Sequence, residues 1–139
     1  MKKVVGIFIV ATMFASCSEA QVETKEISNG NKVQIAQKEK INKVVSAAEF
    51  KKLLTMENVQ LIDVRTPGEY EGGHIDDAAN IDYFSDDFKN QLDKLDRKKP
   101  ILVYCKSGGR SGKAAQVMKS LNFDEVYDLK GGYSRWPSK

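Results

Sequence analysis

The sequence contains two cysteines, and the second of them, Cys105, lies where a nucleophile is expected. A continuous apolar run, Ile101–Tyr104, comes directly before it, which predicts a buried central strand of a parallel sheet. Ligands of open α/β sheets bind beyond the carboxyl ends of such strands. We therefore predict that Cys105 stands at the ligand-binding edge of a sheet.

The loop after Cys105 reads Lys-Ser-Gly-Gly-Arg-Ser, and a predicted helix follows Ser111. Glycines let a backbone curl tightly, so that successive N–H groups converge on one point. With the positive end of the helix dipole, these groups favour an anion such as a thiolate or a persulfide. The same field lowers the pKa of a thiol, so no histidine base is needed.

The loop carries positive charge as well. Lys106, Arg110 and Lys113 lie between residues 104 and 114, where no acidic residue occurs, and such a patch attracts an anionic substrate. We expect Lys113 to be a solvated surface charge. A nucleotide-binding P-loop is excluded because the stretch from Gly108 to Lys113 is one residue too short and Ala114 replaces the hydroxyl that binds magnesium.

Short apolar runs alternate with stretches of helical period, which is typical of an α/β fold with a largely parallel sheet. The candidate strands are Lys43–Val45, Gln60–Val64, Ala79–Ile81, Ile101–Tyr104 and Glu125–Asp128.

Helix starts are marked by capping residues. Ser46 with Glu49, and Thr66 with Glu69, form capping-box patterns, and Ser85 is a candidate cap for a later helix. Apolar residues at helical spacing then predict the buried faces of two further helices, namely Phe88, Leu92 and Leu95, and Ala114, Met118 and Leu121.

The composition allows one domain and an appendage. The chain has 139 residues, of which 41% are hydrophobic and 29% charged, as in soluble globular proteins. Its 22 basic and 19 acidic residues leave a net charge of +3, too small for a dedicated nucleic-acid binder. We expect a monomer that binds no nucleic acid, and we predict no metal site and no cofactor.

The N-terminal segment is typical of an export signal. Lys2 and Lys3 precede an apolar run, Val4–Ala15, that is too short to span a bilayer. The ending Ala15-Ser16-Cys17 resembles the lipobox of bacterial lipoproteins, which implies lipidation of Cys17 and attachment to a cell-envelope membrane, on its periplasmic side or at the outer membrane. We thus predict a signal peptide (1–17), a flexible tether (18–40) and a domain (41–139).

Several segments of the domain together match one known family, in the family's order along the chain. They are Leu61–Arg65, Glu69-Tyr70, Gly73–Ile75, Ala79–Ile81, Cys105–Ser111, Gly131-Gly132 and Trp136. With these segments the domain resembles the rhodanese, or thiosulfate sulfurtransferase, homology family. The resemblance implies an α/β rhodanese-like fold, a five-stranded, mainly parallel sheet flanked by helices on both faces. It also implies that Cys105 takes the outer sulfur of thiosulfate as a persulfide and passes it to a thiol, a protein thiol or cyanide.

The resemblance also implies roles for single residues. Cys105 is the nucleophile, and Lys106 and Arg110 attract and orient the anionic donor. Backbone N–H groups stabilise the thiolate and persulfide from the substrate-binding loop, which comprises Lys106, Ser107, Gly108, Gly109, Arg110 and Ser111.

Four other residues receive structural interpretations. Asp63 and Arg65 match a family motif, and we expect them to join neighbouring loops through a charge-assisted hydrogen bond behind the site. His74 is the single histidine, and we predict a structural role for it because the site needs no base. Trp136 is expected to pack against the domain and hold the C-terminus.

Two alternatives to sulfur transfer stay open. Cell-cycle dual-specificity phosphatases share the fold, but their loop holds seven residues from Cys to Arg, whereas Cys105 to Arg110 holds six. We rank phosphatase or arsenate reductase chemistry lower because the tighter loop suits a single sulfur atom. The second alternative is a membrane-tethered sulfur or redox relay, or a partner-binding module, with little free turnover.

Overall fold

The computed structural model describes residues 38–137. The predictions for the signal segment 1–17, including Cys17, and for tether residues 18–37 lie outside the described residues. Residues 38–40 contact the domain, since Lys38 forms an ion pair with Glu125, and Lys40 donates a hydrogen bond of 2.9 Å to Asn122. Residues 38–40 thus contact the domain, and the predicted division of the chain stays a prediction.

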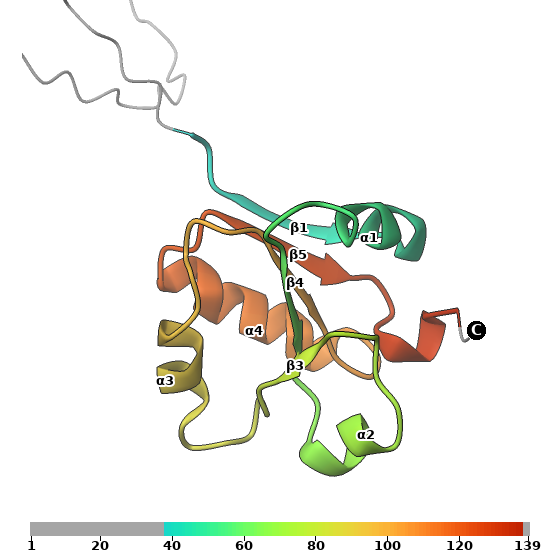
Figure 1. The fold of residues 1–139 in the computed structure, drawn as a ribbon. Helices are drawn as coiled ribbons and strands as arrows, with labels where there is room; N and C mark the ends of the chain where they lie inside the picture. Colours follow the sequence, from blue (N-terminus) through green and yellow to red (C-terminus); the bar gives the residue numbers. More distant parts are fainter. Residues whose placement is uncertain (1–37, 138–139) are drawn as a thin grey trace, which may run out of the picture. The chain divides into compact units, whose positions relative to one another are not determined.

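The chain folds around a five-stranded sheet with strand order β1-β5-β4-β2-β3 (Figure 1). Every pair of neighbouring strands is parallel, which confirms the predicted fold class. All five predicted strands are present, and β4 lies in the middle of the sheet. Their bounds are β1 Ile41–Val45, β2 Gln60–Asp63, β3 Ala79–Asn80, β4 Ile101–Tyr104 and β5 Glu125–Leu129.

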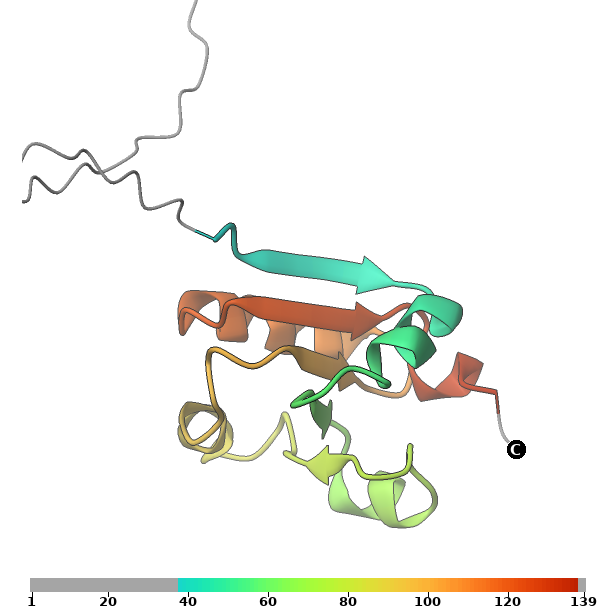
Figure 2. The same ribbon diagram turned by 45° about the horizontal axis from the view of Figure 1, so that its top comes forward.

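The side chains of β4 alternate between two apolar cores. Ile101 and Val103 pack on one face with Met118 of α4 (Gly109–Ser120), while Leu102 and Tyr104 pack on the other with Phe50 of α1 (Ala47–Leu53). In Figure 2, α1 lies in front of the sheet and α4 behind it. Both faces of the central strand are thus covered, which explains its continuous apolar sequence.

Two of the predicted helix starts are confirmed. Ser46 caps α1 and accepts a hydrogen bond of 3.2 Å from the N–H of Glu49. Thr66 and Glu69 form a complete capping box at α2 (Pro67–Glu71), and Gly72 ends that helix. Each motif is encoded within four consecutive residues, so the local sequence is enough to predict it.

Two other helix starts differ from the prediction. Ser85 does not cap α3 (Phe88–Asp93); its hydroxyl accepts from the N–H of Asp87 in the turn before the helix. Helix α4 begins at Gly109 rather than after Ser111, because Gly108 adopts a left-handed conformation with φ of 103° that leads the loop directly into the helix. A short 3-10 helix, Tyr133–Arg135, ends the fold.

No helix within residues 38–137 has the length and apolar character needed to cross a membrane.

Candidate functional site

The Cys105 sulfur lies between the end of β4 and the start of α4 and accepts hydrogen bonds from the loop that joins them and from the first turn of that helix. The residue is 1% exposed, and its Sγ accepts from the N–H of Gly108 at 3.1 Å and from the hydroxyl of Ser111 at 3.4 Å. Burial raises the pKa of the thiol, but the hydrogen bonds from Ser111, from its hydroxyl first and then its N–H, and from the N–H groups of Ser107 and Gly108 outweigh that effect. The net pKa is lowered, as a nucleophilic cysteine requires.

The predicted loop residues differ in their relation to the Cys105 sulfur. Ser107, Gly108 and Ser111 contribute hydrogen bonds that favour the Cys105 thiolate. The side chain of Lys106 is exposed at the rim of the loop, where it can meet an incoming anion. Gly109 is exposed at the first position of α4, where a Cβ would meet no atom within 4 Å.

Arg110 has a partner that the sequence analysis missed. Its guanidinium donates two hydrogen bonds to the carboxylate of Glu69 in α2, at 2.6 and 2.8 Å, and its carbon lies 5.6 Å from the ring centre of Phe84. The hydrogen bonds from Arg110 lower the pKa of Glu69 to about 2, so the pair is ionised at neutral pH. The pair joins α2 to the start of α4, and the donor-orienting role of Arg110 stays a prediction.

Asp63 and Arg65 join the loops behind the site. The guanidinium of Arg65 donates to the Asp63 carboxylate at 2.6 to 3.0 Å and to the carbonyl of Gly73 at 2.7 Å. It also lies 4.3 Å from the ring centre of Tyr133. Both charged residues are buried, and their mutual hydrogen bonds offset the cost of taking the two charges out of water. Through these contacts Arg65 connects the loops after β2, α2 and β5.

The segment after β5 closes the base of the site. Gly132, which is buried, adopts φ of 60°, and a Cβ there would overlap the carbonyl oxygen of Cys105. The N–H groups of Tyr133 and Ser134 then donate to the carbonyls of Cys105 and Lys106, at 2.7 and 2.9 Å. These bonds hold Cys105 and Lys106, the first residues of the loop, in place. The glycine pair, Gly131-Gly132, was the sequence signal for this contact.

Asp128 is a second residue that the sequence analysis missed. It lies on β5 and is 4% exposed, and its Oδ1 has no hydrogen-bond partner within the described residues. Burial raises the pKa of Asp128 to about 6, and the Ser111 side chain opposes this rise.

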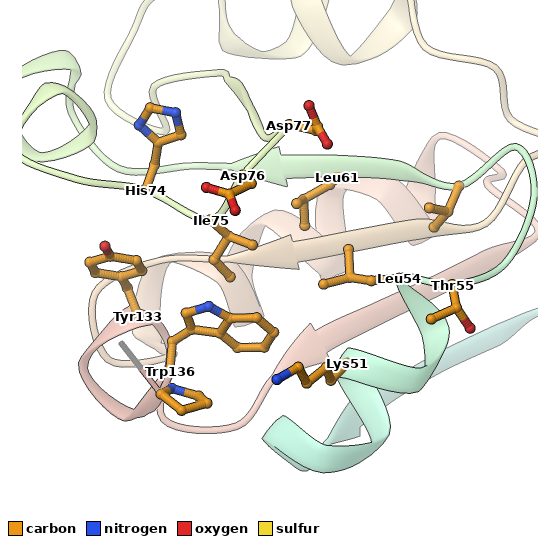
Figure 3. A pocket seen from close by; sticks show the side chains of 12 residues that line it. Lys51, Leu54, Thr55, Leu61, His74, Ile75, Asp76, Asp77, Tyr133 and Trp136 are labelled. Atoms are coloured by element: carbon orange, nitrogen blue, oxygen red, sulfur yellow. The ribbon is translucent and has the colours of Figure 1, made fainter. Parts of the chain in front are cut away.

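His74 and Trp136 border a different hollow of the surface, which Figure 3 shows with Ile75 and Lys51. The exposed His74 ring stacks on Tyr70 at 3.8 Å. Trp136 makes an edge contact with Phe50, with ring centres 5.9 Å apart. These contacts support a structural role for both side chains.

The parallel sheet and the Cys105 loop together define a known class of protein. Residues 46–139 match the family model of the rhodanese-like domain, so the chain belongs to the rhodanese-like family.

The similarity of the chain to individual proteins agrees with this family assignment. It is 39% identical over 101 residues to the uncharacterized protein YqhL of Bacillus subtilis, covering 73% of this chain and 77% of that protein. It is 33% identical over 96 residues to the thiosulfate sulfurtransferase GlpE of Shewanella oneidensis, covering 69% and 87%.

Solved structures match as well. A rhodanese-like domain protein of Staphylococcus aureus superposes with a TM-score of 0.62 and 28% identity, covering 70% of this chain and 93% of that chain. The human single-domain sulfurtransferase TSTD1 gives 0.60 and 25%, covering 67% and 93%. These relatives support a sulfurtransferase-type protein.

The approach of Gly132 to Cys105 generates a first prediction. Gly132→Ala forces a side chain into backbone and into a φ that only glycine adopts readily, so we expect a loss of about 2 kcal/mol or more in unfolding free energy. Cys105 should also react more slowly with iodoacetamide. Urea unfolding and alkylation rates measure the two effects. The control Gly68→Ala, at a position with no atom within 4 Å, should not slow alkylation; wild-type behaviour of Gly132→Ala would contradict the closing role.

The pair of Glu69 and Arg110 generates a second prediction, on pH. Because hydrogen bonds from Arg110 lower the pKa of Glu69 from 4.5 to about 2, the pair stabilises the fold above about pH 4.5 and loses this effect as the pH falls through 2. Urea unfolding of Glu69→Gln should therefore show a deficit of about 1 kcal/mol at pH 7 that shrinks in acid. A loss of unfolding free energy that stays the same at every pH would contradict the proposed stabilisation by this ion pair.

Proposed function

We propose that the protein is a sulfurtransferase that carries a sulfane sulfur on Cys105. The observation that supports this most is the buried Cys105 sulfur under the Gly108 N–H and the Ser111 hydroxyl, which lower the pKa of the thiol. Membership of the rhodanese-like family, and similarity to proteins named thiosulfate sulfurtransferase, point in the same direction.

In the first half-reaction, the Cys105 thiolate attacks the outer sulfur of an anionic donor such as thiosulfate. A bond forms between Sγ and that sulfur, while the bond from the outer sulfur to the sulfite group breaks and its electron pair leaves with sulfite. The negative charge of the thiolate moves to the terminal sulfur of the persulfide. The N–H donors of the loop stabilise the charge in its new position, because they are already oriented before the reaction begins.

In the second half-reaction, a thiolate, a protein thiolate or cyanide attacks the terminal sulfur. The S–S bond of the persulfide breaks, and its electron pair returns to Cys105 Sγ as the thiolate. The site is thereby restored without a cofactor, and the proton balance at Cys105 is unchanged over the cycle.

The two alternatives to sulfur transfer make different demands on the Cys105 loop. A phosphatase or arsenate reductase needs room for a tetrahedral group, and the six-residue span from Cys105 to Arg110 favours a single sulfur atom. A sulfur relay or partner-binding module would show little turnover with small molecules.

Thiosulfate loading gives a third prediction and tests the function directly. After incubation with thiosulfate, intact-mass spectrometry should show a gain of one sulfur atom in the wild-type protein and no gain in Cys105→Ser. Thiosulfate-to-cyanide turnover should exceed hydrolysis of phosphate esters. No sulfur gain would favour the binding module, and faster ester hydrolysis would favour the phosphatase; either result refutes the proposal.

Lys106 gives a fourth prediction, on donor binding. Because its exposed charge attracts the anion, Lys106→Gln should raise the KM for thiosulfate about fivefold, the equivalent of roughly 1 kcal/mol for an exposed charge. The matched control Lys113→Gln removes an exposed lysine on α4 and should change KM less. Steady-state kinetics measure both variants, and equal effects would show that the loop charge is not specific.

A further inference from the structure

The segment after β5 carries two basic side chains outside the predicted site, Lys130 and Arg135. Both are exposed, and no ion pair within residues 38–137 involves either of them. Arg110, in contrast, has its charge paired with Glu69. Within the described part of the chain, Arg135 therefore keeps an uncompensated positive charge.

The stem of the Arg135 side chain lies across the backbone of Gly131. A Cβ at Gly131 would overlap Cγ and Cδ of Arg135 and would lie 3.0 Å from its Nε. Gly131 is the third residue of a turn that closes through a hydrogen bond of 3.0 Å from the N–H of Gly132 to the carbonyl of Leu129. Its φ of 79° favours glycine, and the absence of a side chain leaves the space that Arg135 fills.

This turn lies beside the loop that binds the Cys105 sulfur. The backbone nitrogen of Gly131 is 3.7 Å from the position of a Cβ on Gly108, and the N–H of Gly108 donates to Sγ at 3.1 Å. The Arg135 side chain is thus packed against a turn that itself contacts the loop around the sulfur.

A backbone hydrogen bond joins the neighbourhood of Arg135 to Lys106 as well. Ser134, the residue before Arg135, donates from its N–H to the carbonyl of Lys106 at 2.9 Å. The Lys106 side chain is exposed and forms no ion pair among the residues that the structure describes. Two uncompensated cations therefore come from segments that are hydrogen-bonded to each other beside the nucleophile.

Acidic residues of the site do not cancel this charge. Neither the segment 105–113 nor the segment 130–137 contains an acidic residue. Glu69 and Asp63 are each paired with an arginine, and Asp128 is buried. Both segments thus carry only positive charge, which attracts anions.

We propose that Arg135 is a substrate-binding residue that, together with Lys106, holds the anionic group of the sulfur donor. A guanidinium presents N–H groups in one plane, which match two oxygens of a sulfonate or sulfite group. The resemblance gives such a contact to Arg110, but Glu69 accepts from the guanidinium of Arg110 at 2.6 and 2.8 Å. Arg135 makes the site selective for anions over neutral compounds of similar size.

Alkylation of Cys105 by two reagents that differ in charge tests this selectivity. The full-length chain reacts at one pH with iodoacetate, an anion, or with neutral iodoacetamide, and the rates are read on the peptide that contains Cys105. Both reagents react with the same thiolate, so the ratio of the two rates is independent of the thiol pKa. Arg135→Gln should lower the ratio of the iodoacetate rate to the iodoacetamide rate about threefold, as expected for one exposed charge, and Arg135→Lys should lower it less.

Lys119→Gln is the matched control, because it removes an exposed positive charge from the last turn of α4. It should leave the ratio at the wild-type value. An unchanged ratio in Arg135→Gln, or an equal fall in Lys119→Gln, would overturn the inference.

A second measurement uses the wild-type protein, so it does not depend on how the variants fold. The Nε–H signal of Arg135 in the ¹⁵N-labelled chain is followed by NMR while sodium sulfate, an unreactive dianion, replaces sodium chloride at constant ionic strength. The signal should shift and reach saturation, and a signal that does not move would overturn the inference.

The identity of the anion as a sulfur donor rests on the proposed function, but neither test uses a sulfur donor. Failure of thiosulfate loading and failure of anion selection are therefore separate results.

Discussion

The Cys105 sulfur lies at the end of a fully buried strand, where burial alone disfavours the anion that sulfur chemistry needs. Two donors from the residues that follow Cys105 offset this cost of burial. They are the Gly108 N–H, at 3.1 Å from Sγ, and the Ser111 hydroxyl, at 3.4 Å. They are rigid because the strand before Cys105 and the helix after the loop are both packed into the core. An anion in water would require solvent to reorganise, whereas here the donors are already in place.

Distant parts of the chain hold this loop in shape. The backbone at Gly132 approaches Cys105 so closely that no side chain fits between them, and the next two N–H groups bond to the loop carbonyls. Arg65 connects Asp63 with the carbonyl of Gly73 and packs on Tyr133. The chain segments that follow three parallel strands thus meet at one edge of the sheet, and the site depends on their mutual contacts as much as on the loop itself.

Local sequence signals were sufficient for elements that depend on nearby residues. The apolar run Ile101–Tyr104 predicted a central strand, and Thr66 with Glu69 predicted the start of α2. Contacts between distant residues left no local signal, as with Glu69 and Arg110, which are 41 positions apart. Asp128 was missed because an acidic residue at the end of a predicted strand is typical of an exposed position, and its burial depends on how α4 packs over β5.

The pKa of the Cys105 thiol is the most direct test of the compensation between burial and hydrogen bonding. It can be measured from thiolate absorbance at about 240 nm as a function of pH, with the same titration of Cys105→Ser subtracted to remove other contributions. The hydrogen bonds to Sγ predict that the thiolate forms below the ordinary thiol pKa of about 8.5. A Cys105 thiolate that forms only at or above that value would show that burial prevails and would contradict the role of Cys105 as an ionised nucleophile.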